Sequence, residues 1–160
     1  MNPLILPIAV IMQRRVLTGR WATQAWEVHS VLRDPGGARS FGETLVQGKG
    51  LDCYWFGGLQ LVLYRDELEG YYLNVSAPEP KVFVLWRLED DVAVPLTATV
   101  SYHEAARSMD GGEQVDAVAM PPEVYAWVGD YVESHYRPEL KRVRRRDQSP
   151  FQEHGKVSSE

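Results

Sequence analysis

The chain has 160 residues, 44% of them hydrophobic, which is enough for one hydrophobic core of ordinary size and too little for two full domains. Residues 137–160 hold 7 Lys and Arg against 4 Asp and Glu, whereas residues 1–136 hold 10 against 18. An acidic body repels nucleic acid and anionic lipid, so nucleic acid is disfavoured as a partner except through the basic tail.

The first expected element is a strand at residues 4–12, a short apolar segment rich in β-branched side chains. The segment does not resemble a secretion signal, because no basic residue precedes it and two prolines interrupt it. A run of 18 apolar residues is found nowhere in the sequence, so no membrane span is expected. We therefore expect a cytoplasmic protein.

The next segments predict a strand, a loop and a hairpin. Residues 24–33 alternate loosely between apolar and polar side chains, which is typical of a half-buried strand. Residues 34–50 hold five glycines and few large apolar groups, which favours a long loop. Residues 52–64 alternate on either side of two consecutive glycines at 57–58, which predicts a hairpin that turns there.

Further strands are expected in the second half of the chain, bounded by prolines and acidic turns. They lie at residues 71–76, 82–87, 96–100 and 114–119. A short helix should begin after Ser101, because Ser101 and Glu104 have the spacing of a capping box, in which each side chain bonds the backbone N–H of the other.

A second helix is expected at residues 120–136, with Pro122 in its first turn and Pro138 after its end. Its apolar residues recur at steps of three and four, which places them on one stripe that must be covered. The stripe consists of Val124, Trp127, Val128, Tyr131, Val132 and His135.

Together these elements predict an α+β fold that is mainly antiparallel β. About eight short strands would form a partly closed barrel or a two-layer sandwich, accompanied by a short capped helix and a C-terminal amphipathic helix. Residues 1–136 are expected to form a single globular domain. Residues 137–160 have too few apolar groups to offset the entropy of ordering them, so we expect a flexible basic tail.

The residue types that usually carry chemistry are scattered along the chain. Cys53 is the only cysteine, which excludes an internal disulfide, and its neighbour Asp52 would raise the pKa of the thiol. The four histidines do not stand at metal-ligand spacing, and the paired glycines lack the residues of a phosphate loop. We therefore expect no catalytic residues, no metal and no cofactor.

Two features favour contact with a protein partner. Trp21 lies in a linker flanked by glycine and arginine rather than on an expected strand. The tail carries a dense basic run that could bind an acidic surface. The basic residues expected to take part are Arg137, Lys141, Arg142, Arg144, Arg145 and Arg146.

Several segments resemble a bacterial family catalogued as a domain of unknown function and encoded beside formate dehydrogenase accessory genes. The specific match is the contiguous stretch from Glu104 to His135, and weaker matches include LPIAVIMQRR, YYLNV and VFVLWR. The resemblance covers most of residues 4–146, with residues 34–50 as a local insertion. It implies a role in assembly or maturation of a molybdenum-dependent formate dehydrogenase, and it supplies no catalytic residues.

The leading hypothesis is a non-enzymatic accessory protein that binds a formate dehydrogenase subunit or its chaperone. The alternative is a small-ligand-binding protein or enzyme with a pocket at the mouth of the barrel. That pocket would be built from residues scattered along the sequence, namely Tyr71, Asn74, Arg87 and His103.

Overall fold

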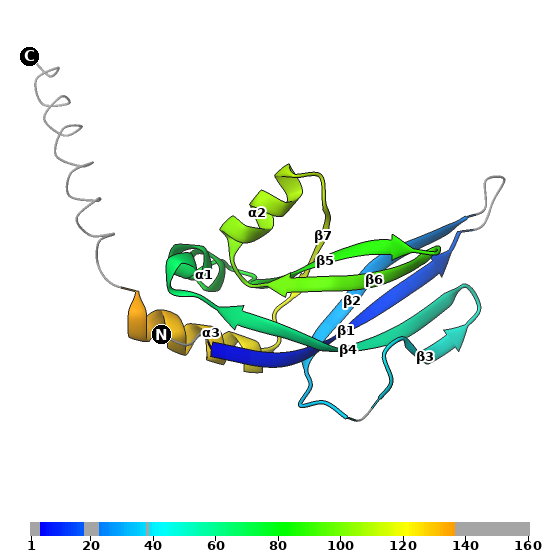
Figure 1. The fold of residues 1–160 in the computed structure, drawn as a ribbon, viewed down its shortest axis with the longest axis horizontal. Helices are drawn as coiled ribbons and strands as arrows, with labels where there is room; N and C mark the ends of the chain where they lie inside the picture. Colours follow the sequence, from blue (N-terminus) through cyan, green and yellow to red (C-terminus); the bar gives the residue numbers. More distant parts are fainter. Residues whose placement is uncertain (1–3, 18–22, 38, 137–160) are drawn as a thin grey trace, which may run out of the picture.

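Seven strands and three α-helices make up the part of the chain that the computed structural model describes, which is residues 4–17, 23–37 and 39–136 (Figure 1). The strands are β1 Leu4–Val16, β2 Gln24–Arg33, β3 Glu43–Gly48, β4 Leu51–Leu63, β5 Lys81–Glu89, β6 Val92–Thr99 and β7 Gln114–Ala119. The helices are α1 Leu68–Val75, which follows a 3-10 turn at Arg65–Glu67, then α2 Tyr102–Asp110 and α3 Pro122–His135.

The strands form two antiparallel sheets, ordered β2-β1-β4-β3 and β6-β5-β7. Their inner faces share one core that includes Met12 and Leu61 from the first sheet and Val84 from the second, all fully buried. The sheets also come close along two lines, β2 beside β7 and β4 beside β6, but no strand ladder joins them in the described part of the chain. The mainly antiparallel α+β class is confirmed, and the sheets do not close into a barrel.

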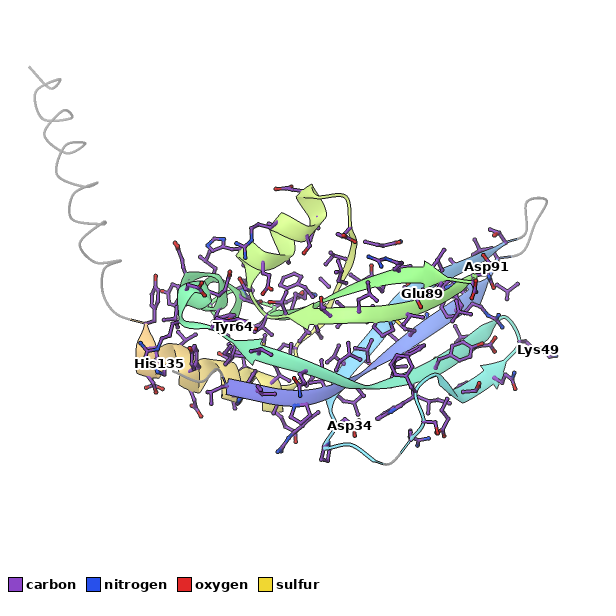
Figure 2. All side chains as sticks on the ribbon, in the orientation of Figure 1. Asp34, Lys49, Tyr64, Glu89, Asp91 and His135 are labelled. Atoms are coloured by element: carbon purple, nitrogen blue, oxygen red, sulfur yellow. The ribbon has the colours of Figure 1, made fainter. Side chains whose placement is uncertain are left out.

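The molecule is elongated, with helices at one end and hairpin tips at the other (Figure 1). Helices α1 and α3 pack together, and their buried side chains Tyr71, Val124 and Val128 extend the core beyond the sheets. Figure 2 shows Lys49 and Asp91 at the tips of the β3–β4 and β5–β6 hairpins, far from His135 at the helical end. The core therefore runs the length of the molecule.

The predicted hairpin at residues 52–64 is wrong. β4 is one continuous strand that pairs with β1, and the register slips between Ile8↔Leu59 and Val10↔Phe56. The slip accommodates an extra residue at Gly57 and Gly58, and Gly58 has a φ of +83°. A β-bulge and a tight turn both use glycine at positive φ, so the same residues predict either structure.

The strand expected at residues 71–76 is also wrong, because these residues belong to helix α1. Tyr71 and Asn74 stand three positions apart and are both fully buried, which is the spacing of one helical face. The loop expected at residues 34–50 contains β3, an edge strand whose residues are mostly exposed. It lacks the apolar alternation from which a strand is normally recognised.

The capping box at the start of α2 is half right. The backbone N–H of Glu104 donates to the Ser101 hydroxyl oxygen at 3.1 Å, as expected. The Glu104 carboxylate instead accepts from the Thr99 hydroxyl at 2.6 Å, and the Ser101 N–H donates to the Thr99 oxygen at 3.0 Å. The Thr99 hydroxyl thus replaces the Ser101 N–H as the donor to the Glu104 carboxylate, and its oxygen accepts the Ser101 N–H.

Helix α3 is confirmed, with Pro122 in its first turn. Four members of the predicted stripe are buried, namely Val124, Val128, Tyr131 and Val132, whereas Trp127 and His135 are half-buried. The stripe covers the core at the helical end, and Trp127 lies at its margin.

Candidate functional site

The residues expected to line a pocket do not converge. Tyr71 is fully buried, and its hydroxyl oxygen accepts from the Tyr64 N–H at 2.8 Å. Burial raises the pKa of Tyr71, so the hydroxyl stays protonated. Asn74 is also fully buried, and its amide nitrogen donates to the carbonyls of Lys81 and Val100. Both side chains use their polar groups to hold α1 against the sheets.

The other two expected pocket residues lie on the surface. Arg87 has a side chain 56% exposed and lies 3.9 Å from Glu113. His103 is 46% exposed, and its Nε2 lies 3.7 Å from a carboxylate oxygen of Glu69. Trp21 and the six basic residues of the tail lie outside the described residues.

A polar cluster joins the first turn of α2 to the segment before α1. The Ser101 hydroxyl donates to Glu67 at 2.6 Å, and Arg107 donates to the other carboxylate oxygen of Glu67 at 2.6 Å. Burial alone would raise the pKa of Glu67, but the hydrogen bonds from Ser101 and Arg107 outweigh it and lower the pKa overall. Ser101 is fully buried, and its hydroxyl both donates and accepts a hydrogen bond. It therefore connects α2 to the segment before α1 and is not a nucleophile.

A small cavity of about 110 Å³ lies beside this cluster, under α2. Its walls are mostly side chains of the outer face of the β6-β5-β7 sheet and of α2. They are Phe83, Leu85, Thr97, Ala98, Thr99, Glu104, Ala105, Ser108 and Val115. The Glu104 carboxylate and the Thr99 hydroxyl bond each other there, which leaves this cavity little means of orienting a ligand.

The outer edge of β2 carries backbone groups that no described strand pairs. The Val16 N–H donates to the Gly50 carbonyl at 2.9 Å, so the even-numbered residues at this end of β1 direct their backbone groups toward β4. Trp26 and Val28 lie opposite two of these residues. In an antiparallel ladder, residues at such positions direct their own N–H and C=O away from the partner strand. Trp26 and Val28 therefore present theirs at the free edge.

The outer edge of β7 is unpaired in the same way. The Met120 N–H donates to the Pro80 carbonyl at 3.1 Å, so the even-numbered residues of β7 face β5. By alternation, Val115 and Ala117 direct their backbone N–H and C=O groups away from β5. In the described part of the chain, β2 forms a ladder with β1 alone and β7 with β5 alone, so Trp26, Val115 and Ala117 have no second strand partner on these outer sides.

We call the space between these two edges the seam. It is an open hollow of about 480 Å³ lined by consecutive residues of both strands, together with Trp86 from β5. The lining residues are Trp26, Glu27, Val28, Trp86, Gln114, Val115, Asp116 and Ala117.

The seam is crossed by a hydrogen bond. The Asp116 carboxylate accepts from the backbone N–H of Val28 at 2.8 Å. Asp116 points to the inner face with Val84, its neighbour on β5, so its carboxylate stands where a neighbouring strand would place a carbonyl. The side chain of Asp116 therefore occupies one pairing position of β2 and leaves the others open.

Two indole groups beside the seam lack a protein acceptor. Trp86 is only 4% exposed, and the Nε1 atoms of Trp86 and Trp26 are buried with no hydrogen-bond partner among the described residues. A buried donor without an acceptor costs about 1–3 kcal/mol. These N–H groups would gain from any ligand that brings an acceptor to them.

A cation holds the Trp26 ring in place. Arg14 forms an ion pair with Asp52, and the hydrogen bond to that carboxylate raises the pKa of the guanidinium. Its central carbon lies 5.9 Å from the ring centre of Trp26 and 6.0 Å from that of Tyr54, which is the range of a cation–π contact. Trp26 is thus a fixed wall of the seam.

Two residues beside the seam lie on strands that the sequence predicted. Trp26 belongs to the strand expected at residues 24–33 and Trp86 to the strand expected at residues 82–87, and both contact the core. Asp116 carried no signal, because a lone acidic residue within an expected strand is unremarkable. The pairing state of the strand edges depends on register, and register between distant strands is not visible in the residues themselves.

Cys53 is buried. Burial raises the pKa of its thiol, and the negative charge of Asp52 raises that pKa further. Within the described part of the chain, His, Cys, Asp and Glu side chains do not gather in groups of three or more suited to a metal ion. None of the helices described has the length and apolar composition needed to cross a bilayer.

Comparison with known proteins identifies a family. The chain fits the model of a family described as "Protein of unknown function (DUF3305)" over residues 7–146. No curated protein and no solved structure matches it. Since the family model covers far more than half of the chain, the chain belongs to the DUF3305 family.

Proposed function

We propose that this protein is a non-enzymatic accessory protein that assists assembly or maturation of a molybdenum-dependent formate dehydrogenase by binding a protein partner. The partner would be a subunit of that enzyme or its chaperone, and the complex would form in the cytoplasm. The direction comes from the resemblance of residues 104–135 to a family encoded beside formate dehydrogenase accessory genes.

The seam is the observation that favours action by binding. It offers backbone donors and acceptors at Trp26, Val115 and Ala117 that no second described strand pairs in a ladder. Unpaired strand edges are a ready template for another chain, and proteins normally cover or blunt them. An open pair of edges facing one hollow is therefore suited to receive a partner.

A second candidate is the binding of a small ligand in the same hollow. The unpartnered indole groups of Trp26 and Trp86 favour it, because a compact ligand with acceptor oxygens would satisfy them. This site replaces the one expected from Tyr71, Asn74, Arg87 and His103, whose side chains are dispersed.

Deleting the gene in its bacterial host tests the first candidate. Formate dehydrogenase activity should fall while the amount of mRNA for its catalytic subunit stays constant. The tagged wild-type protein should restore the activity and should copurify with a subunit of the enzyme or with its chaperone. Unchanged enzyme activity in the deletion strain would rule out the proposed function.

The contribution of the basic tail is tested with purified protein that lacks it. A chain ending at residue 136 should keep its melting temperature and bind the copurified partner more weakly, because a cationic segment raises the encounter rate with an acidic surface. The difference should shrink as salt screens charges over about 8 Å at physiological ionic strength. Equal affinity of both chains at low and high salt would show that the tail does not contribute.

A further inference from the structure

We infer that the seam binds a small, neutral cyclic amide or ureide, whose carbonyl oxygens accept hydrogen bonds from buried N–H groups of Arg14, Trp26 and Trp86. The inference rests on one part of the proposed function, the second candidate, in which the hollow holds a small ligand. It goes further in naming the chemical class of that ligand and the side chains that recognise it. It does not depend on a formate dehydrogenase.

Buried donors without an acceptor gather beside the seam. Among the described residues, buried side-chain nitrogens that lack a hydrogen-bond partner belong to Arg14, Trp26, Trp86 and Trp55. Trp26 and Trp86 both line the hollow, and the Arg14 guanidinium lies 5.9 Å from the centre of the Trp26 ring. Trp55 is separate, because it follows Tyr54, whose ring contacts Trp26, and successive side chains of a strand point to opposite faces. Since buried polar groups are nearly always hydrogen-bonded, the donors at the seam point to a ligand that brings acceptors.

The charges around the seam disfavour an anionic ligand. The Arg14 guanidinium is already paired with the Asp52 carboxylate. The Asp116 carboxylate, in contrast, is bonded to a neutral backbone group, the N–H of Val28, at 2.8 Å. Asp116 therefore leaves a negative charge at the seam, which repels carboxylates and phosphates and favours a neutral acceptor.

The strand edges require donors as well as acceptors from a ligand. Outward-facing residues such as Val115 and Ala117 each direct an N–H and a C=O to the same side. A cyclic amide or ureide carries an N–H beside a C=O on one flat ring, so it can bond such a residue while another carbonyl reaches an indole N–H. The hollow has a volume of about 480 Å³, within the range of about 300–1,000 Å³ that is usual for ligand pockets.

The seam must widen before a ligand can reach the three side chains, because their unpartnered nitrogens are buried. In the described part of the chain no ladder joins the two sheets, and the Val28 N–H bonds to the Asp116 carboxylate across the seam. Widening therefore breaks this hydrogen bond and leaves the ladders of both sheets intact. A bound ligand should consequently change the surroundings of the Val28 amide as well as those of the indole groups.

Nuclear magnetic resonance of the ¹⁵N-labelled full chain tests the inference with two probes. Uracil is a neutral cyclic ureide, and orotate is the same ring with an added carboxylate. Each tryptophan gives an indole N–H resonance, which tryptophan-to-phenylalanine variants assign. Uracil should move the indole resonances of Trp26 and Trp86 and the amide resonance of Val28, and it should leave the indole resonance of Trp55 in place. Its Kd should be on the order of 1 mM, as expected for so small a ligand, and orotate should bind about tenfold more weakly.

Trp86→Phe and Trp55→Phe form a matched pair, because each keeps an aromatic ring and removes a buried indole N–H that has no described partner. Uracil affinity should fall about tenfold in Trp86→Phe and stay within about twofold in Trp55→Phe. Asp116→Asn keeps an acceptor for the Val28 N–H and removes the charge, so orotate affinity should rise about tenfold. Circular dichroism checks that the three variants remain folded.

The outcomes separate this inference from the proposed function. Uracil that leaves the Trp26 and Trp86 resonances in place, or that loses equal affinity in Trp86→Phe and Trp55→Phe, would overturn the inference. Orotate that binds the wild type as tightly as uracil would do the same. If uracil binds at the seam while formate dehydrogenase activity is normal in the deletion strain, the ligand site stands and the accessory function falls. If that activity is lost and uracil does not bind, the accessory function stands and the ligand site falls.

Discussion

Replacing Asn74 with alanine is expected to lower the free energy of unfolding by about 3–5 kcal/mol, because it strips hydrogen bonds from several buried backbone groups. The Asn74 amide nitrogen donates to the carbonyls of Lys81 at 2.7 Å and Val100 at 2.8 Å, and its oxygen accepts from the Lys81 N–H at 2.9 Å. The last pair of the β5–β6 ladder toward this end joins Phe83 and Thr99. Asn74 thus continues the ladder where β6 no longer supplies a neighbour to β5.

Urea unfolding followed by tryptophan fluorescence measures this effect. Leu73→Ala is the matched control, because Leu73 is the adjacent residue of α1 and is 40% exposed, so its loss should cost less than about 1 kcal/mol. A typical domain has only about 5–15 kcal/mol of stability, so the loss in the Asn74 variant is a large share of the total. A destabilisation as small as that of the control would show that water or a neighbour replaces the amide.

Replacing Gly70 with alanine is expected to cost about 3 kcal/mol through overpacking, although alanine is the better helix former. An added Cβ would collide with the Ser101 hydroxyl and come within 3.3 Å of the His103 backbone nitrogen. Ser101 cannot move aside, because its hydroxyl donates to Glu67 at 2.6 Å and accepts from the Glu104 N–H at 3.1 Å. The close approach of α1 to the start of α2 therefore requires glycine.

Gly129 in α3 provides a control of opposite sign. Apart from the adjoining residues and backbone of the helix itself, no described atom lies within 4 Å of the position that its Cβ would occupy, so Gly129→Ala should stabilise the protein by about 0.5–1 kcal/mol through helix propensity alone. Thermal unfolding of both variants compares them directly. Equal and small shifts in melting temperature would contradict the tight contact between Gly70 and Ser101.

The elements that the sequence predicted correctly are those whose signal is local. β5 is a run of β-branched and aromatic residues, and α3 begins at Pro122 and repeats its apolar residues at helical spacing. Helix α1 was missed because its residues favour a strand locally. Its buried positions are fixed instead by distant groups, the Tyr64 N–H for Tyr71 and the Lys81 and Val100 backbone for Asn74.

The seam could not be predicted from the sequence, for a related physical reason. Which backbone groups of β2 face outward depends on the ladder between β1 and β4, set in part by the Val16–Gly50 hydrogen bond. That ladder in turn contains the bulge at Gly57 and Gly58, which the sequence predicted as a turn. Because this glycine pair was assigned to a turn, the β1–β4 ladder could not be predicted, and neither could the open edges.

Hydrogen exchange of the backbone amides tests the open seam most directly. In the free protein, the amides of Trp26, Val115 and Ala117 should exchange much faster than those of Glu27 and Asp116, which face β1 and β5 in the same strands. Adding the partner protein should slow the three outward amides. If those three are already as well protected as Glu27 and Asp116 in the free protein, the edges are paired and the binding seam does not exist.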